Sequence, residues 1–470
     1  MMANLSAIEV ESGAGGTLVY GPGYTQFSSV SIDTRTMRRG ALFFAIRGPN
    51  QDGHRFIPDA VAKGASGIVT EQAYEFPGEL PPEVVLIKTT DTHQALKYLA
   101  MYVRRRWQGT LVAVTGSMGK TTTREFAAQV AQGKFRTYQT PGNYNNLFGL
   151  PLALIGMPLD DEIGIFEMGM SAPGEIAEMC RIANPVTGII TNVAAVHLEF
   201  FKSIEEIARA KAELAESLPA NGTLIFNADD PMVCGIAARF GGRKISFGLS
   251  RQADIRAGEI EIAGVDKTRF RLLVDGTSFP ASVPFAGAHY VMNALPAVAL
   301  GWQLNILPDQ IIARLEQLQP VAMRGQVLRF DEGFTVIDDS YNSNPRALMQ
   351  MIEVLSKAPS FTRRILVAGE MLELGKDSPA LHSECGTFAV DQKVDIIIGI
   401  QGAAREIVRA AITAGMSETD AHYFADSNAA TAFVNNTVRS GDLLLIKGSR
   451  GVHTEKIVQT LRARFRLLES

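Results

Sequence analysis

The stretch Val112-Ala-Val-Thr-Gly-Ser-Met-Gly-Lys-Thr-Thr-Thr123 begins as an apolar strand and runs into a glycine-rich turn. A helical pattern over 122–134 follows at once, so the N–H groups of the turn and of the helix start face one point. Such a turn favours an anion, to which Lys120 adds a positive charge and Thr121 a hydroxyl ligand for a metal ion. The stretch predicts a nucleoside triphosphate site. An ordinary strand-to-helix connection remains an alternative, because two residues separate the glycines where the usual loop has four.

Composition bounds the class of protein. A chain of 470 residues is too long to fold around a single hydrophobic core and suggests about three domains. A hydrophobic fraction of 46% and a charged fraction of 20% are typical of a soluble enzyme. The formal net charge is −4 and no basic run stands out, so we expect no nucleic-acid partner.

The apolar runs and the cysteine spacing bear on where the protein is located. The sequence shows neither an apolar run long enough for a bilayer nor a secretory signal at its start, so we expect a cytoplasmic protein without membrane insertion. We also expect a monomer. The widely spaced Cys180, Cys234 and Cys385 predict buried thiols rather than disulfides or a zinc site.

The region 1–107 predicts a small α/β domain. Helical patterns at 56–63 and 93–105 alternate with short apolar runs. The polar clusters Ser31-Ile-Asp-Thr-Arg35 and Asn50-Gln-Asp-Gly-His54 can contact a phosphate, ribose or uracil, although ordinary loop polarity explains them as well. The expected strands are 41–46, 67–70 and 84–87.

The region 108–318 repeats polar residues at strand ends. A strand over 162–166 ends in Glu167, and the next, over 186–190, is followed by His197. Ligands of parallel sheets lie outside the carboxyl ends of strands, so Thr121, Glu167 and His197 are expected to converge. Oxygen and imidazole ligands suit a divalent cation there. A solvated Glu167 or a structural His197 is the simpler explanation for each residue alone.

The helix expected at 204–218 places Lys211 on its apolar face. Burial lowers the pKa of a lysine, and the neutral amine can capture carbon dioxide as a carbamate, an anionic oxygen ligand. Snorkelling to the surface or pairing with a phosphate are alternatives that the periodicity leaves open. The apolar residues at steps of three and four are Ile204, Ala208, Ala215 and Leu218.

The region 319–470 predicts a second, mostly parallel sheet. Polar residues again follow its strands, as in Asp338-Asp-Ser-Tyr-Asn-Ser-Asn-Pro345 and Lys447-Gly-Ser-Arg450. Asn293, before an apolar helix at 294–300, either contacts a nucleotide base or caps that helix, and its position favours the cap. The expected strands are 334–337, 365–368, 394–398 and 443–446.

Together these motifs resemble the Mur ligase family of bacterial cell-wall synthesis. The shortened loop 115–121, Glu167, His197 and Lys211, which follows His197 by 14 residues, occur in the order of that family. The resemblance implies an α/β fold of three domains. They are a UDP-sugar-binding N-terminal domain (1–107), a phosphate-loop NTPase-like central domain (108–318) and a Rossmann-like C-terminal domain (319–470) that binds an incoming dipeptide.

Further motifs are similar to the members that add D-alanyl-D-alanine to UDP-N-acetylmuramoyl-tripeptide. These motifs are Gly142–Leu152, Glu167–Ile176, Asp338–Pro345 and Lys447–Arg450. Members that add the third residue carry Asp-Asn-Pro-Arg where this chain has Ser343-Asn-Pro-Arg346. The chain departs from the family at Met170-Ser171 and Gly451-Val-His453. The resemblance implies an ATP-dependent amide ligase that uses Mg²⁺ and forms an acyl phosphate during peptidoglycan precursor synthesis, and so serves cell shape and division.

The resemblance also implies roles for single residues. Contacts to the ATP phosphates fall to Thr115, Gly116, Ser117, Met118, Gly119, Lys120, Thr121 and Thr122. Other nucleotide contacts fall to Asn293, Arg324 and either Asp338 or Asp339. The magnesium ligands are Thr121, Glu167, His197 and a carbamylated Lys211, and the catalytic residues are Lys120, Glu167, His197 and Lys211. Substrate contacts fall to Ser31, Asp33, Arg35, Asp52, His54, Asn143, Asn145, Asn146, Tyr341, Asn342, Asn344, Lys447 and Arg450.

Other functions stay open. The nearest is a different ATP-dependent ligase, adding meso-diaminopimelate or lysine, or a folylpolyglutamate synthetase. A phosphate-loop NTPase acting as a switch or kinase would leave the second α/β domain and its polar strand ends without a purpose. A non-enzymatic nucleotide-binding scaffold is the third alternative. Only a ligase that adds D-alanyl-D-alanine would release phosphate from ATP when both UDP-N-acetylmuramoyl-tripeptide and D-alanyl-D-alanine are present and not otherwise. This requirement distinguishes it from the alternatives.

Overall fold

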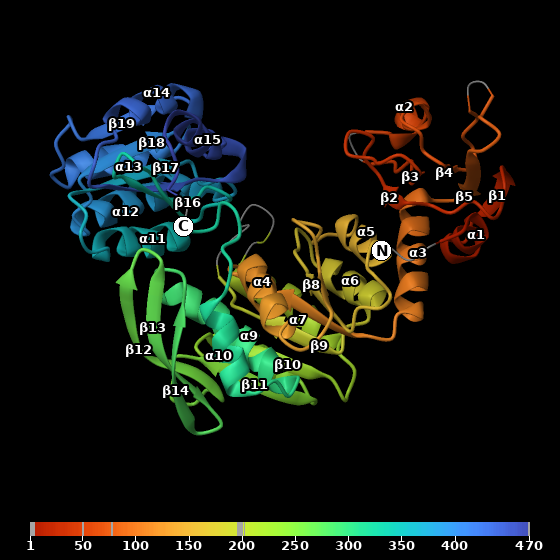
Figure 1. The fold of residues 1–470 in the computed structure, drawn as a ribbon, viewed down its shortest axis with the longest axis horizontal. Helices are drawn as coiled ribbons and strands as arrows, with labels where there is room; N and C mark the ends of the chain where they lie inside the picture. The colour runs from red at the N-terminus through yellow and green to blue at the C-terminus, as the bar shows by residue number, and fades with distance from the viewer. Residues whose placement is uncertain (1–4, 49–50, 77–78, 195–200, 202, 469–470) are drawn as a thin grey trace. The chain divides into compact units, whose positions relative to one another are not determined.

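The computed structural model describes residues 5–48, 51–76, 79–194, 201 and 203–468. Within them the chain forms three sheets with helices packed on them (Figure 1). The mixed α/β class expected from the sequence is confirmed. The chain divides into two compact units, one of Met1–Arg124, Ala131–Val193 and Ala208–Ile245, the other of Glu125–Val130, Ala194–Ile207 and Ser246–Ser470.

The first sheet has the order β1-β5-β4-β3-β2 and is parallel except for β1. Its strands are β1 (Thr17–Tyr20), β2 (Ser29–Ser31), β3 (Ala41–Phe44), β4 (Gly67–Glu71) and β5 (Val85–Thr89). Its helices are α1 (Ala7–Ala14), η1 (Gly53–Phe56), α2 (Ile57–Ala62) and α3 (Thr92–Arg106). The sequence analysis predicted neither β1, β2 nor α1. The start of α1 carries a local signal nonetheless, because Ser6 and Glu9 form a reciprocal capping box.

The second sheet has the order β14-β13-β12-β11-β10-β9-β6-β8-β7. Its parallel part brings the carboxyl ends of β6, β8 and β9 to one edge, since Val114 pairs with Glu167 and Thr115 with Ile190. The strands of this part are β6 (Thr110–Thr115), β7 (Thr137–Gln139), β8 (Ile163–Glu167), β9 (Thr187–Ile190), β10 (Thr223–Asn227) and β11 (Arg243–Gly248). The helices are α4 (Lys120–Ala131), α5 (Gly149–Ile155), α6 (Glu175–Ala183), α7 (Ile204–Glu216) and α8 (Pro231–Arg239).

Three antiparallel strands that the sequence analysis did not predict extend this sheet: β12 (Ile255–Gly264), β13 (Lys267–Val274) and β14 (Thr277–Val283). Asp275 and Gly276 form the β13–β14 turn with φ of 49° and 73°, the pairing that a two-residue hairpin favours. The helices α9 (Ala288–Gln303) and α10 (Pro308–Glu316) follow. The cap predicted for Asn293 is wrong, because α9 begins five residues earlier and Asn293 lies inside it.

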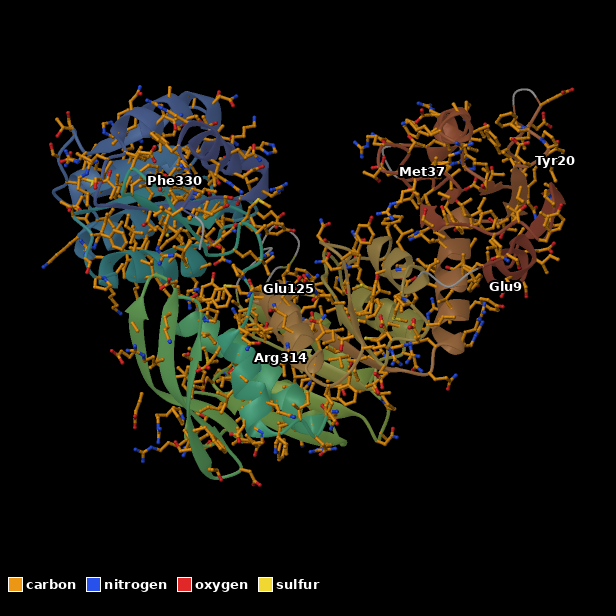
Figure 2. The ribbon with its side chains drawn as sticks, viewed as in Figure 1. Glu9, Tyr20, Met37, Glu125, Arg314 and Phe330 are labelled. Atoms are coloured by element: carbon orange, nitrogen blue, oxygen red, sulfur yellow. The ribbon has the colours of Figure 1, made fainter. Side chains whose placement is uncertain are left out.

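The third sheet, order β15-β16-β20-β17-β18-β19, contains all four strands expected there. The strands are β15 (Gln326–Arg329), β16 (Thr335–Asp339), β17 (Arg363–Gly369), β18 (Ile396–Ile400), β19 (Ala421–Phe424) and β20 (Asp442–Lys447). The helices are α11 (Pro345–Lys357), η2 (Gly375–Asp377), α12 (Ser378–Asp391), α13 (Ala404–Thr413), α14 (Ser427–Thr437), η3 (Arg450–Val452) and α15 (Glu455–Arg464). Phe330 stacks on Phe334 inside the core of this sheet. Figure 2 labels Phe330 among the side chains packed around this sheet.

The burial predicted for the three cysteines is confirmed for two of them. Cys180, Cys234 and Cys385 are free thiols, of which Cys180 and Cys385 are buried and Cys234 is half-buried. In the part of the chain that the structure describes, every helix is too short or too polar to cross a membrane.

Candidate nucleotide and substrate site

The turn between β6 and α4 depends on its two glycines. Gly116 has φ of 150° and Gly119 has φ of 77°, a region that side chains other than hydrogen disfavour. A Cβ atom at Gly116 would lie 1.8 Å from Oγ1 of Thr191. Glycine at 116 is therefore required both by the backbone angle and by the close approach of the strand next to β6.

Two residues at the end of β9 hold this turn in place. Asn192 binds Met118 twice: its Oδ1 accepts from the Met118 N–H at 2.9 Å and its Nδ2 donates to the Met118 carbonyl at 3.1 Å. The Thr191 hydroxyl donates to the same carbonyl at 2.6 Å, and the Ser117 N–H donates to the Asn192 carbonyl at 2.9 Å. The loop is thus shaped in advance by a neighbouring strand end, to which the sequence analysis assigned no role.

The lysine and threonines of the loop have different positions. Lys120 Nζ donates to the carbonyls of Gly116 at 2.8 Å and Ser117 at 3.3 Å, so the ammonium group lies over the loop. Thr121 and Thr122 are in the first turn of α4, where backbone N–H groups favour an anion. The Thr115 hydroxyl instead donates to the Met168 carbonyl at 2.8 Å, which leaves that side chain a structural role.

Glu167 is buried, with two neighbours on its carboxylate and one on its backbone N–H. Its Oε1 accepts from Asn145 Nδ2 at 2.8 Å, and its backbone N–H donates to Thr140 Oγ1 at 3.1 Å. Arg124 of α4, of which only 2% is exposed, lies 3.5 Å from Oε2. The sequence analysis missed Arg124, although its place four residues after Lys120 puts it on the same side of α4.

Lys211 of α7 is 2% exposed, so snorkelling is excluded for this side chain. Its Nζ lies 4.0 Å from Met170 Sδ. Desolvation, with the positive charge of Lys120 adding to it, holds the pKa of Lys211 well below its usual range. The expected inward position of Lys211 is therefore confirmed, and the direction of its pKa shift agrees with the expectation. His197, the residue expected to act beside it, lies outside the described residues.

The side chains of Thr121, Glu167 and Lys211 have the chemistry that a nucleotide with bound magnesium requires. The strand register places Glu167 opposite Val114, one residue before the end of β6, at the edge where the loop that leads to Thr121 begins. A hydroxyl and a carboxylate are the hard oxygen ligands that Mg²⁺ prefers, and a carboxylate keeps lone pairs after accepting one hydrogen bond. A buried neutral amine is also the form of lysine that reacts with carbon dioxide.

A pocket of about 680 Å³ gathers several residues of the predicted substrate site. Arg35 binds both carboxylate oxygens of Asp33, at 2.9 and 2.7 Å, and the Ser31 hydroxyl donates to the Asp33 carbonyl. On the other side, Asn146 accepts from the Gly149 N–H at 2.8 Å at the start of α5. The predicted residues that line the pocket are Asp33, Arg35, Asn143 and Asn146.

His54 and Asp52 have a different arrangement. His54 Nδ1 lies 2.6 Å from Asp52 Oδ1, and its Nε2 accepts from the Glu71 N–H at 3.1 Å. Both ring nitrogens of this buried histidine are therefore engaged within the first sheet. The pair shapes the loop beside the pocket, and neither residue is part of the pocket lining.

At the carboxyl ends of the third sheet, Lys447 joins two predicted residues. Its Nζ donates to Asp339 Oδ2 at 2.6 Å and to the Asn342 carbonyl at 2.8 Å. Asp338 accepts from the Ser340 hydroxyl at 2.6 Å, and desolvation raises the pKa of this buried carboxyl. Asn344 caps α11 by accepting from the Ala347 N–H at 2.9 Å.

An aromatic ring in the same unit is flanked by two cations. The Arg324 guanidinium lies 4.1 Å from the ring centre of Tyr341, and that of Arg450 lies 5.8 Å from it. The Arg324 carbonyl accepts from the Tyr290 hydroxyl at 3.0 Å, which ties this segment to α9. Two guanidiniums beside one ring form a surface suited to a carboxylate or a phosphate.

Comparisons with known proteins agree with this architecture. Three family models match: the catalytic domain of the Mur ligase family over residues 26–104, the Mur ligase middle domain over 114–301 and the Mur ligase glutamate ligase domain over 323–450. The UDP-N-acetylmuramoyl-tripeptide–D-alanyl-D-alanine ligase of Bacillus subtilis is 32% identical over 449 residues, 95% of this chain and 96% of that protein. The Escherichia coli ligase of the same name is 32% identical, over 92% of this chain and 93% of that protein.

Solved structures are similar over comparable lengths. A crystal structure of MurF from Acinetobacter baumannii has a TM-score of 0.86 and 27% identity, and covers 98% of this chain and 99% of its own. The MurF ligase of Thermotoga maritima, crystallised in complex with ADP, has a TM-score of 0.78 and 27% identity, covering 93% and 97%. With three matching domain models and relatives above 30% identity along nearly the whole chain, this protein belongs to the Mur ligase family.

Proposed function

We propose that the chain is the ATP-dependent ligase that joins D-alanyl-D-alanine to UDP-N-acetylmuramoyl-tripeptide, a cytoplasmic step of peptidoglycan precursor synthesis carried out by a monomer. Relatives of this name match over nearly the full length of the chain, which supports that substrate pair over the other substrates of the family. The observation that carries the proposal is the glycine loop, braced by β9, next to the buried carboxylate of Glu167.

The chemistry explains why ATP is needed. A carboxylate is a poor electrophile, so one of its oxygens first attacks the γ-phosphorus of ATP, and ADP leaves. The product is an acyl phosphate. The free amine of D-alanyl-D-alanine then attacks the acyl carbon, the C–O bond to phosphate breaks, and the amine gives up a proton as the amide forms.

Two anions meet in the first step, so positive groups are required. Lys120 and the N–H groups of the loop face the triphosphate and offset its charge. Magnesium, when bound, adds further compensation of the phosphate charges. Thr121 and Glu167 would hold one ion, and His197 with a carbamylated Lys211 would help to hold a second. Asn145 and Arg124 keep the Glu167 carboxylate in one orientation.

The substrates are assigned to the other parts of the chain. The pocket with Asp33, Arg35 and Asn146 receives the UDP-sugar peptide, since its polar groups suit phosphate and ribose. Lys447, Tyr341 and Arg450 receive the dipeptide. The same proposal divides the chain at 107 and 318 into domains for the UDP-sugar, ATP and dipeptide.

Phosphate release is the direct test. With purified protein, ATP and Mg²⁺, release is expected only when UDP-N-acetylmuramoyl-tripeptide and D-alanyl-D-alanine are both present. Turnover with meso-diaminopimelate or lysine and the dipeptide acceptor UDP-N-acetylmuramoyl-L-alanyl-D-glutamate would favour a different member of the family. Turnover with neither substrate would favour an NTPase and contradict the proposal.

A further inference from the structure

A second pocket in the unit that holds the phosphate loop has no role in the proposed reaction. It has a volume of about 440 Å³ and lies where the last turn of α3 meets the last turn of α6. The two helices are in contact, as Figure 1 shows. The residues that line it are Met101, Arg104, Arg105, Trp107, Gln108, Gly109, Arg181, Ile182 and Asn184.

The charge of this pocket is one-sided. Three arginines line it, and no carboxylate is among its described lining residues. Arg104 and Arg105 follow Met101 by three and four residues, so each lies beside Met101 on the helix surface, and all three line the pocket. The carboxylate closest in sequence to the α6 arginine, Glu178, lies 2.7 Å from Lys97 Nζ and 3.8 Å from Arg181. Its negative charge is thus largely compensated by Lys97.

One of the arginines is already fixed in place. Arg104 donates to the carbonyls of Ala183 at 2.6 Å, Asn184 at 3.1 Å and Trp107 at 3.1 Å, and its guanidinium stacks 5.0 Å from the Trp107 ring centre. These bonds satisfy the carbonyls at the end of α6, which would otherwise repel an anion. Because a guanidinium has five N–H groups, donors remain after these three bonds.

The other two arginines are adaptable. The side chain of Arg105 is exposed and makes no hydrogen bond or ion pair with any described residue. Arg181 is about half exposed and makes only a long contact to Glu178 and one to Met101 Sδ at 3.8 Å. Two weakly held guanidiniums beside a fixed one match the several oxygens of a phosphate group, which guanidiniums bind through paired hydrogen bonds.

The pocket lies at the N-terminal end of strand β6, and the phosphate loop lies at the C-terminal end of the same strand. Gly109 precedes the first residue of β6, whereas the loop follows its last residue, Thr115. A strand of six residues spans about 20 Å, so one ligand of ordinary size cannot fill both places. We propose that this arginine pocket binds a small phosphorylated anion, with diphosphate as its simplest representative, at a site separate from the nucleotide loop.

Trp107 offers a local probe, because the chain has only two tryptophans and the other is Trp302. In a Trp302→Phe protein, diphosphate is expected to change Trp107 emission saturably with a Kd below about 1 mM. The change persists after Lys120→Ala, which disables the phosphate loop. It weakens at least about tenfold in Arg105→Ala/Arg181→Ala, because each lost charge-assisted hydrogen bond costs affinity.

A matched pair tests whether the effect is local. Arg439→Ala/Arg462→Ala removes two exposed positive charges from the other unit and is expected to leave the Kd within about twofold. Arg105→Lys/Arg181→Lys keeps the charge but loses the forked geometry, and should give an intermediate Kd even where the alanine pair folds poorly.

Several results would overturn the proposal. They are an unresponsive Trp107, equal weakening by the two alanine pairs, and loss of the signal with Lys120→Ala. Tighter binding of citrate than of diphosphate would overturn the assignment to phosphates. None of these readouts depends on ligase turnover, so the proposal fails or stands independently of the proposed function.

Discussion

Replacing Gly116 by alanine tests whether the phosphate loop is held by its contact with β9. The new Cβ would lie 1.8 Å from Thr191 Oγ1, so the hydroxyl must leave its 2.6 Å hydrogen bond to the Met118 carbonyl. Losing that bond costs about 1 kcal/mol, and holding alanine at φ of 150° costs about 1–3 kcal/mol more. The loop of the variant relaxes to relieve these costs and must return to the present conformation to bind ADP, so the sum of about 2–4 kcal/mol predicts a loss of ADP affinity of roughly 30- to 1,000-fold.

Isothermal titration with ADP measures this effect, and circular dichroism monitors the fold. Gly276→Ala is the control, since Gly276 also has a positive φ but an added Cβ meets no atom within 4 Å; it should lower stability and leave ADP affinity unchanged. Thr191→Ala should weaken ADP binding in the wild type but not in the Gly116→Ala protein, where the clash has already broken the bond. Wild-type affinity for Gly116→Ala, or an equal effect of Thr191→Ala in both backgrounds, would refute the reasoning.

Three further predictions concern single side chains. Lys120→Ala should lower ligation by at least about 100-fold with little change in unfolding temperature, because the triphosphate loses its point charge; undiminished turnover would remove Lys120 from the site. Lys211→Ala should abolish turnover and recover part of it with short-chain carboxylates such as acetate, which replace a carbamate; indifference to the substitution would contradict a catalytic Lys211. Arg35→Ala should raise the KM for UDP-N-acetylmuramoyl-tripeptide about tenfold while kcat and the KM for ATP change little, and a change confined to kcat would argue against a binding role.

Many parallel strands of the chain were predictable because they are short apolar runs between helical patterns, whereas the short and more polar parallel strand β2 was not. The expected strands over 162–166, 186–190 and 443–446 appear as β8, β9 and β20 with shifts of one residue at most ends. The antiparallel strands β12 and β13 were missed, although Thr268, Phe270, Leu272 and Val274 alternate with more exposed residues before the Asp275-Gly276 turn. This alternation of buried and exposed residues has the period of two that predicts a half-buried strand. Continuous apolar runs, in contrast, predict only strands that are buried on both faces.

The chemical groups of the site were more predictable than their supports. Lys120, Glu167 and Lys211 stand out in the sequence because a motif, a strand end or a helix face marks them. Arg124 and Asn192 do not, since an arginine inside a helix and an asparagine after a strand are ordinary in composition. Their roles arise from strand order, because β9 and β8 lie on either side of β6. Asn293 is an opposite case. Its polar side chain predicted a helix start, but Asn293 lies inside the longer helix α9.

In the proposed reaction, ATP activates the terminal carboxylate of the acceptor peptide by converting it to an acyl phosphate. The measurement that tests it most directly uses UDP-N-acetylmuramoyl-tripeptide whose terminal carboxylate carries ¹⁸O, with mass spectrometry of the phosphate released during ligation to D-alanyl-D-alanine. An acyl phosphate passes one carboxylate oxygen to the phosphate, so each released phosphate should carry one ¹⁸O atom. Unlabelled phosphate accompanying amide formation would contradict the account.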